Sequence, residues 1–188
     1  EQDIEAIKQI REAVGSSIRL RMDANQGWTV SDAVKVMNGV EKYQVEAVEQ
    51  PLPSWDIDGM AYVRKKVPIP VMADESVHSP RDAYQVAKKQ AADVINIKLM
   101  KSGGLYKAMS INNIAEAAGI QCMVGCMLES KIAITAGASL VAAKKNITEA
   151  DMDSFLYVKD IGINGGIQLD HGKITLPERP GLGIDLDM

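Results

Sequence analysis

The sequence predicts an α/β fold of the (β/α)8 barrel type, of which about six βα units are present. Short apolar runs alternate with amphipathic helical stretches, and successive runs end in a polar residue at steps of 26, 25 and 24 residues. No hairpin signal separates the runs, which favours parallel strands joined by helices. A doubly wound parallel sheet would also fit. The barrel explains more, because polar residues at the carboxyl ends of its strands converge on one mouth.

Six segments are expected to form the strands. They are residues 17–23, 45–49, 69–74 and 94–98, followed at the same period by 121–126 and 146–153. Apolar residues at helical spacing predict helices over 1–15, 29–43, 56–67 and 79–90. Ser31-Asp32 and Ser79-Pro80 resemble helix starts, since proline is favourable at the first helical position.

A closed barrel needs eight strands, and the strand that should precede the helix at 1–15 is absent from this chain. We therefore expect one incomplete barrel domain over residues 1–188, either a fragment or a chain whose missing strands come from elsewhere. An open parallel sheet exposes its edges, which favours a homo-oligomer. A catalytically inert partial barrel that folds only by association remains an alternative.

The composition excludes several classes of partner. The formal net charge is -4 and no basic patch has interleaved aromatic residues, which argues against nucleic acid and anionic membranes. No apolar run approaches the roughly 20 residues that span a bilayer. Cys122 and Cys126 would lie about 13 Å apart in a strand, too far for a disulfide. Free thiols fit a reducing cytoplasm, the expected location.

Three carboxylates end three consecutive predicted strands: Asp23, Glu49 and Asp74. At a barrel mouth they would repel one another unless a cation lay between them. Mg²⁺ prefers oxygen ligands and keeps positions open for a substrate. A single aspartate at a strand end is commonly a helix cap, whereas three at regular spacing favour a metal site.

Lys98 ends the next predicted strand, beside those carboxylates. A lysine next to a metal-bound substrate can transfer a proton at a carbon adjacent to a carboxylate, while the metal stabilises the resulting enediolate. Alternatively, Lys98 forms a salt bridge with Asp74 or extends out of the mouth.

The motifs "MDANQGW", "VEQPLP", "MADES" and "NIKLMKSGG" resemble the strand ends of the enolase superfamily, in its muconate-lactonizing subgroup. The terminal "ERPGLGIDLD" is typical of the end of this family. The resemblance implies barrel strands three to eight plus a C-terminal tail, without the N-terminal capping domain. It also implies Mg²⁺ bound by the three carboxylates, Lys98 as general acid/base, and Asn25 supporting the metal shell. Lys101 is expected to lie outside the proton-transfer site.

The last predicted strand ends in Asp151-Met152-Asp153, with both aspartates on one face. This pair could be surface or cap carboxylates, but by resemblance it looks like the dipeptide epimerases of the L-Ala-D/L-Glu type, where it holds the free α-ammonium. Glu129, near the mouth, is a weaker candidate for substrate contact.

The family's second catalytic lysine, in a K-x-K motif, belongs to the strand absent here. We therefore expect this chain to exchange at best one face of the α-carbon. N-acylamino-acid racemisation, o-succinylbenzoate synthesis and muconate cycloisomerisation remain alternatives, although their substrates carry no free ammonium.

Overall fold

The computed structural model describes residues 1–159 and 162–187 of the 188. It contains two compact units, Glu1–Ile95 and Asn96–Met188. The strand order is β1-β2-β3-β4-β5-β6 within a parallel sheet. The division between the units lies within β4 (Val94–Ile97). The α/β class and the consecutive parallel order agree with the prediction.

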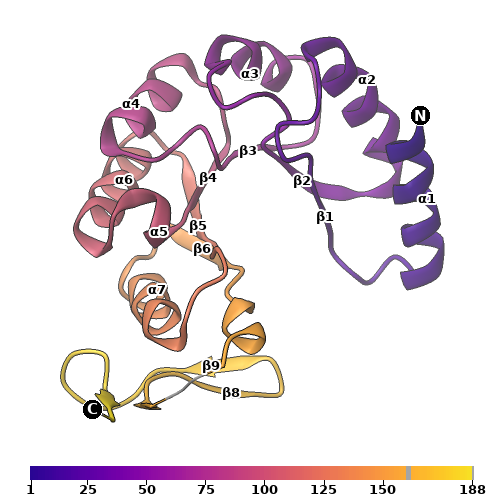
Figure 1. Ribbon diagram of the computed structural model, residues 1–188. Coiled ribbons are helices and arrows are strands. Elements are labelled where there is room, and N and C mark those ends of the chain that lie inside the picture. Colours follow the sequence, from indigo (N-terminus) through magenta and orange to yellow (C-terminus); the bar gives the residue numbers. More distant parts are fainter. Residues whose placement is uncertain (160–161, 188) are drawn as a thin grey trace. The chain divides into compact units, whose positions relative to one another are not determined.

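The first unit consists of three βα repeats that follow an initial helix. Its helices all lie on one side of its strands (Figure 1). Val48 and Val71, at the centre of this unit, are fully buried. The elements are α1 (Gln2–Val14), β1 (Leu20–Asp23), α2 (Val30–Val40), η1 (Glu41–Tyr43), β2 (Val45–Glu49), α3 (Ile57–Arg64), β3 (Val71–Ala73) and α4 (Pro80–Lys89).

Side-chain caps mark the start of three of these helices, α2, α3 and α4. As predicted, α4 begins after Ser79, whose hydroxyl accepts a hydrogen bond from the N–H of Asp82 at 3.3 Å. In α2 the cap is Thr29, whose hydroxyl accepts from the N–H of Asp32 at 3.2 Å. The predicted start at Ser31 is therefore wrong by two residues, because the Thr29 hydroxyl already caps the N–H of Asp32 and the helix begins at Val30.

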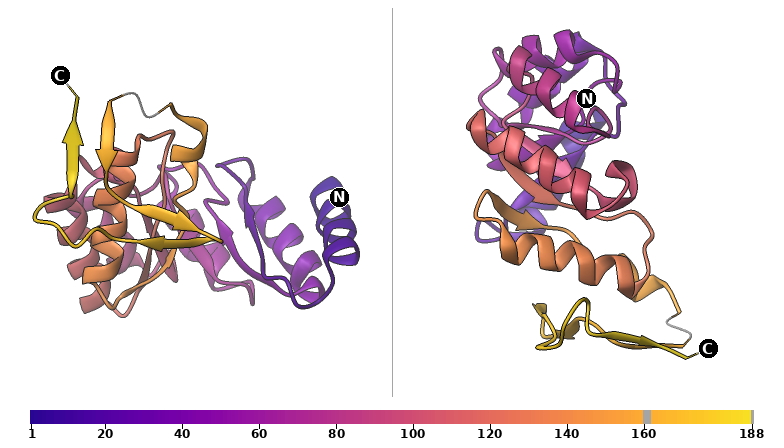
Figure 2. Two further views of the ribbon diagram at one scale, coloured as in Figure 1. Left: turned by 90° about the horizontal axis from the view of Figure 1, so that it is seen from below. Right: turned by 90° about the vertical axis from the view of Figure 1, so that its left-hand side faces the viewer.

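The second unit continues the βα pattern and then changes architecture. Two pairs of short antiparallel strands follow β6, and the β8–β9 hairpin lies next to α7 (Figures 1 and 2). The elements are α5 (Leu99–Ser102), α6 (Leu105–Ala117), β5 (Gln121–Val124), α7 (Lys131–Ala143), β6 (Ile147–Ala150), η2 (Ser154–Tyr157), β7 (Ile163–Gly165), β8 (Gln168–Asp170), β9 (Lys173–Thr175) and β10 (Ile184–Leu186). The sequence pattern predicts β5 and β6 but none of the four strands that come after them.

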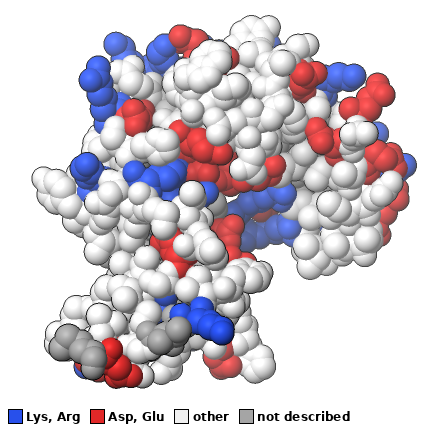
Figure 3. Space-filling view, viewed as in Figure 1, with Lys and Arg blue, Asp and Glu red and all other residues white. Residues whose placement is uncertain are grey.

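Acidic and basic side chains are mixed over the face of the protein drawn in Figure 3. Among the residues that the structure describes, no helix is long and apolar enough to cross a membrane.

Both cysteines are free thiols, as predicted. Cys122 lies in β5, is fully buried and accepts a hydrogen bond from the Asn146 side chain at 3.7 Å. Burial raises the pKa of the Cys122 thiol to about 12, the charge of Glu116 adds to the rise, and the hydrogen bond from Asn146 opposes it. The thiol is therefore neutral and protected in the folded protein.

We expect Cys122 to resist alkylation until the protein unfolds. With Cys126→Ser, so that a single thiol remains, iodoacetamide at pH 8 should modify the folded protein at least about 100-fold more slowly than the urea-unfolded protein, because only the thiolate reacts. The unfolded thiol ionises near its ordinary pKa, whereas the folded thiol ionises near 12. The free energy of unfolding should therefore fall as the pH rises from about 9 to 12. Equal rates of modification, measured by mass spectrometry, would contradict the burial of this thiol.

Candidate active site

In the first unit, the strand register places two of the predicted carboxylates side by side. Asp23 pairs with Glu49 where β1 and β2 run parallel, and Glu49 in turn pairs with Met72 of β3. Asp74 follows two residues after Met72 and is buried, with an exposed fraction of 3%. Three consecutive strand ends of this unit therefore each carry one acidic residue.

The loop after β1 binds the carboxylate of its own strand end. The backbone N–H of Asn25 donates to Oδ1 of Asp23 at 2.9 Å, and Asn25 has a φ of +43°, a conformation that asparagine tolerates better than most residues. Asn25 is thus placed to orient Asp23 through its backbone N–H.

The donor chemistry of this unit suits a hard divalent cation. Asp23, Glu49 and Asp74 offer only carboxylate oxygens, which Mg²⁺ prefers over nitrogen or sulfur. Across residues 1–159 and 162–187, however, no three His, Cys, Asp or Glu side chains form a group arranged to hold a metal ion. The assignment of these three carboxylates to Mg²⁺ therefore remains a prediction.

In the second unit, Lys98 follows directly after β4 and is half-buried. Its carbonyl accepts hydrogen bonds from the N–H and the hydroxyl of Ser102, at 3.0 and 3.1 Å, so the short helix α5 holds its backbone. Asn96, two residues earlier, is buried against Gly125, where a Cβ atom would lie 2.6 Å from its Oδ1. Lys101 donates to the carbonyl of Asn96 at 3.2 Å.

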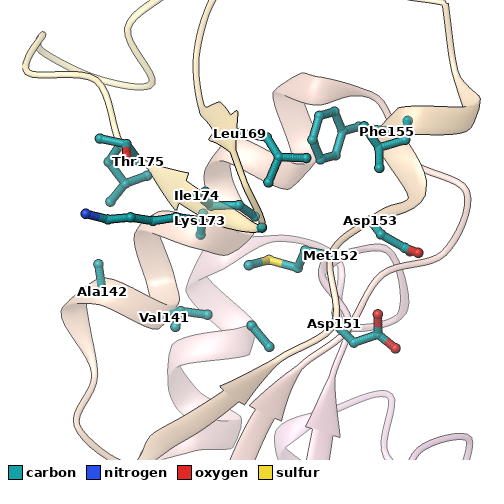
Figure 4. Close-up of a pocket in the computed structure, with 15 residues that line it drawn as sticks. Val141, Ala142, Asp151, Met152, Asp153, Phe155, Leu169, Lys173, Ile174 and Thr175 are labelled. Atoms are coloured by element: carbon teal, nitrogen blue, oxygen red, sulfur yellow. The ribbon is translucent and has the colours of Figure 1, made fainter. Parts of the chain in front are cut away.

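The end of β6 presents two carboxylates on one face. Asp151 and Asp153 are exposed, whereas Met152 between them is buried, and both carboxylates point away from the side chain of Met152 (Figure 4). The N–H of Asp151 donates to the carbonyl of Val124 at 2.9 Å, which ties this segment to the end of β5. The alternation is the one that the sequence predicts.

An apolar pocket of about 800 Å³ lies on the opposite side of this segment, between α7, η2 and the β8–β9 hairpin. Met152, Leu169 and Ile174 point into it (Figure 4). Asp151 and Asp153 border the pocket, but their carboxylates turn away from it. The acidic pair and the pocket are therefore on different faces.

Glu129 lies in the loop between β5 and α7, with an exposed fraction of 4%. Its Oε1 accepts from the N–H of Met127 at 3.0 Å, and its own N–H donates to the hydroxyl of Ser154 at 3.2 Å. Glu129 thus connects this loop to the segment after Asp153. A contact between Glu129 and a substrate remains a prediction.

The enolase C-terminal domain-like family matches residues 1–188, the whole chain. The chain belongs to this family. The family match confirms the resemblance drawn from the strand-end motifs and the prediction of an incomplete barrel of the (β/α)8 type.

Two relatives and one solved structure show what this enolase-family chain is similar to. The hydrophobic dipeptide epimerase of Enterococcus faecalis is 50% identical over 98% of this chain and 52% of its own length. The L-Ala-D/L-Glu epimerase of Bacillus subtilis is 47% identical over 97% of this chain and 50% of its own length. A crystal structure of the Enterococcus faecalis dipeptide epimerase, complexed with Mg and the dipeptide L-Leu-L-Tyr, matches with a TM-score of 0.92 over 97% of this chain and 52% of that one.

The chain therefore spans about half the length of the curated relatives that it matches. The names of these relatives describe them as epimerases, a class of isomerase, that act on dipeptides.

Proposed function

We propose that this chain carries the metal-binding and proton-transfer residues of a Mg²⁺-dependent epimerase of dipeptides. The observation that carries the proposal is the pair Asp151 and Asp153, two exposed carboxylates on one face of the segment after β6. A dipeptide brings a free α-ammonium group, and two carboxylates on one face can bind it through charge-assisted hydrogen bonds. The relatives named as dipeptide epimerases support the same substrate class.

In this proposal Asp23, Glu49 and Asp74 hold the metal ion. When bound, Mg²⁺ supplies positive charge that stabilises the negative charge developing on the substrate carboxylate as the α-proton leaves. The backbone N–H of Asn25 orients the carboxylate of Asp23, which limits the geometries that this ligand can adopt.

Lys98 is the proposed general acid/base. Its neutral amine accepts the proton from the α-carbon on one face, and its ammonium form returns a proton to that face. Inversion at the α-carbon needs a second group on the opposite face, so Lys98 by itself accounts for exchange with solvent and not for the whole epimerisation.

The proposal is tested by incubating the purified protein in D2O with Mg²⁺ and either L-Ala-L-Glu or L-Ala-D-Glu, so that each face of the α-carbon is examined, and following the substrate by NMR. Loss of the α-proton signal supports the proposed proton transfer, and a new diastereomer in addition shows that a second acid/base group acts with Lys98. No exchange, from protein shown to be folded and to bind Mg²⁺, would refute the proposed activity.

Association between copies of the chain is also proposed, and sedimentation velocity measures it directly.

A further inference from the structure

A buried glutamine follows the carboxylate at the end of β2. Gln50 has an exposed fraction of 0% and a φ of +36°, a backbone region that non-glycine residues rarely occupy. Such a conformation persists only where surrounding contacts enforce it, and it is often found at functional sites. The contacts of Gln50 therefore need a specific explanation.

The amide group of Gln50 joins the loop after β2 to the loop after β3. Its Oε1 accepts hydrogen bonds from the N–H groups of Asp74 and Ser76, at 3.0 and 3.1 Å. Its Nε2 donates to the carbonyl of Leu52 at 2.8 Å and to the hydroxyl of Ser76 at 2.9 Å. Both the oxygen and the nitrogen of the Gln50 amide are therefore hydrogen-bonded, and one of their partners is the backbone N–H of Asp74.

The same network extends to the loop after β1. The hydroxyl of Ser76 donates to the carbonyl of Ser54 at 3.0 Å, and the N–H of Ser54 donates to Oε1 of Gln26 at 2.9 Å. The N–H of Gln26 donates in turn to the carbonyl of Gln50 at 2.8 Å. Three loops, each beginning directly after one of the carboxylates at the strand ends, are therefore connected through Gln50.

We propose that Gln50 is a positioning residue, which holds the backbones of Glu49 and Asp74 at a fixed separation so that their carboxylates are arranged for a divalent cation. This inference rests on the proposed function, which assigns Mg²⁺ to these carboxylates. Residues that orient metal ligands without touching the metal typically change metal affinity by 10–100-fold when replaced. A core amide with a purely structural role would change thermal stability and leave the affinity of the folded protein unchanged.

Gln50→Asn separates these two roles. Asparagine keeps the amide and tolerates a positive φ, but it is one carbon shorter and cannot span from Leu52 to Asp74. We expect the Kd for Mg²⁺, measured by isothermal titration calorimetry on the purified protein, to rise about 10–100-fold. Circular dichroism should show a folded protein. Gln9→Asn, the same substitution on the exposed surface of α1, should leave the Kd within about twofold.

Ser76→Ala provides a second variant for the case in which Gln50→Asn does not fold. It removes the hydroxyl between Gln50 and Ser54 but keeps both hydrogen bonds to Oε1. Loss of ordinary hydrogen bonds predicts a rise in Kd of about 2–10-fold. An unchanged Kd in the folded variants would overturn the positioning role. A wild-type protein that does not bind Mg²⁺ would instead refute the proposed metal site, and the inference with it.

Discussion

Replacing Lys98 with methionine is expected to slow the exchange of the substrate α-proton by about 10²–10⁴-fold, the range typical for loss of a general acid/base. Methionine keeps a long, flexible side chain at this half-buried position but cannot accept a proton. The exchange is measured by NMR in D2O with saturating Mg²⁺ and dipeptide, so that the rate reports proton transfer and not binding.

Lys145→Met is the matched control for this prediction. Lys145 is exposed in the connection between α7 and β6, so the same change of side chain should leave the exchange rate unaltered. Lys98→Met should also bind Mg²⁺ as the wild type does, because Lys98 is not a proposed ligand. If Lys98→Met exchanged the α-proton at the wild-type rate, the role assigned to this lysine would be wrong.

The double substitution Asp151→Asn, Asp153→Asn is expected to lower kcat/KM for α-proton exchange of a dipeptide by at least about 100-fold. Each hydrogen bond between a carboxylate and the substrate ammonium contributes about 1.5–3 kcal/mol, and the neutral amides cannot compensate for the charge. The effect should appear mainly as a higher KM, because the ammonium is bound in the ground state as well as in the transition state.

This double variant also discriminates between the dipeptide reaction and its alternatives. An N-acylated amino acid has no free ammonium, so any turnover of such a substrate should not decrease. The double substitution Asp170→Asn, Glu178→Gln, at two exposed positions, removes the same two negative charges and controls for the change in overall charge. A loss of the same size for both kinds of substrate would show that the aspartates do not recognise an ammonium group.

The regular part of the fold follows from local signals in the sequence. Apolar runs 24 to 26 residues apart predict the positions of β1 to β4, because the stretch between two runs is long enough for one crossover helix and its two loops. Ser79 marks the start of α4 for a local reason as well, since a serine side chain can satisfy the free N–H of Asp82 three residues later. The start of α2 is less well predicted, because the sequence pattern favours Ser31-Asp32, whereas the residue that caps the helix is Thr29.

The four short strands at the C-terminal end have no comparable signal. Strands β7 to β10 are three residues each, too short for an alternating pattern to be distinguished from a loop. Their pairing depends on which segments meet in space, as in the antiparallel pair of β7 and β10, which are separated by 18 intervening residues (166–183).

The sequence by itself determined the order of the βα units and the acidic or basic residue at each of four strand ends, because both depend on the periodicity of a single stretch of backbone. Only the tertiary structure identified Gln50, whose bond to Asp74 joins residues 24 positions apart. Although "VEQPLP" places a polar amide directly before an apolar turn, its partners exist only once the loops after β2 and β3 lie against each other. A buried amide must find hydrogen-bond partners inside the protein, and folding decides which groups those partners are.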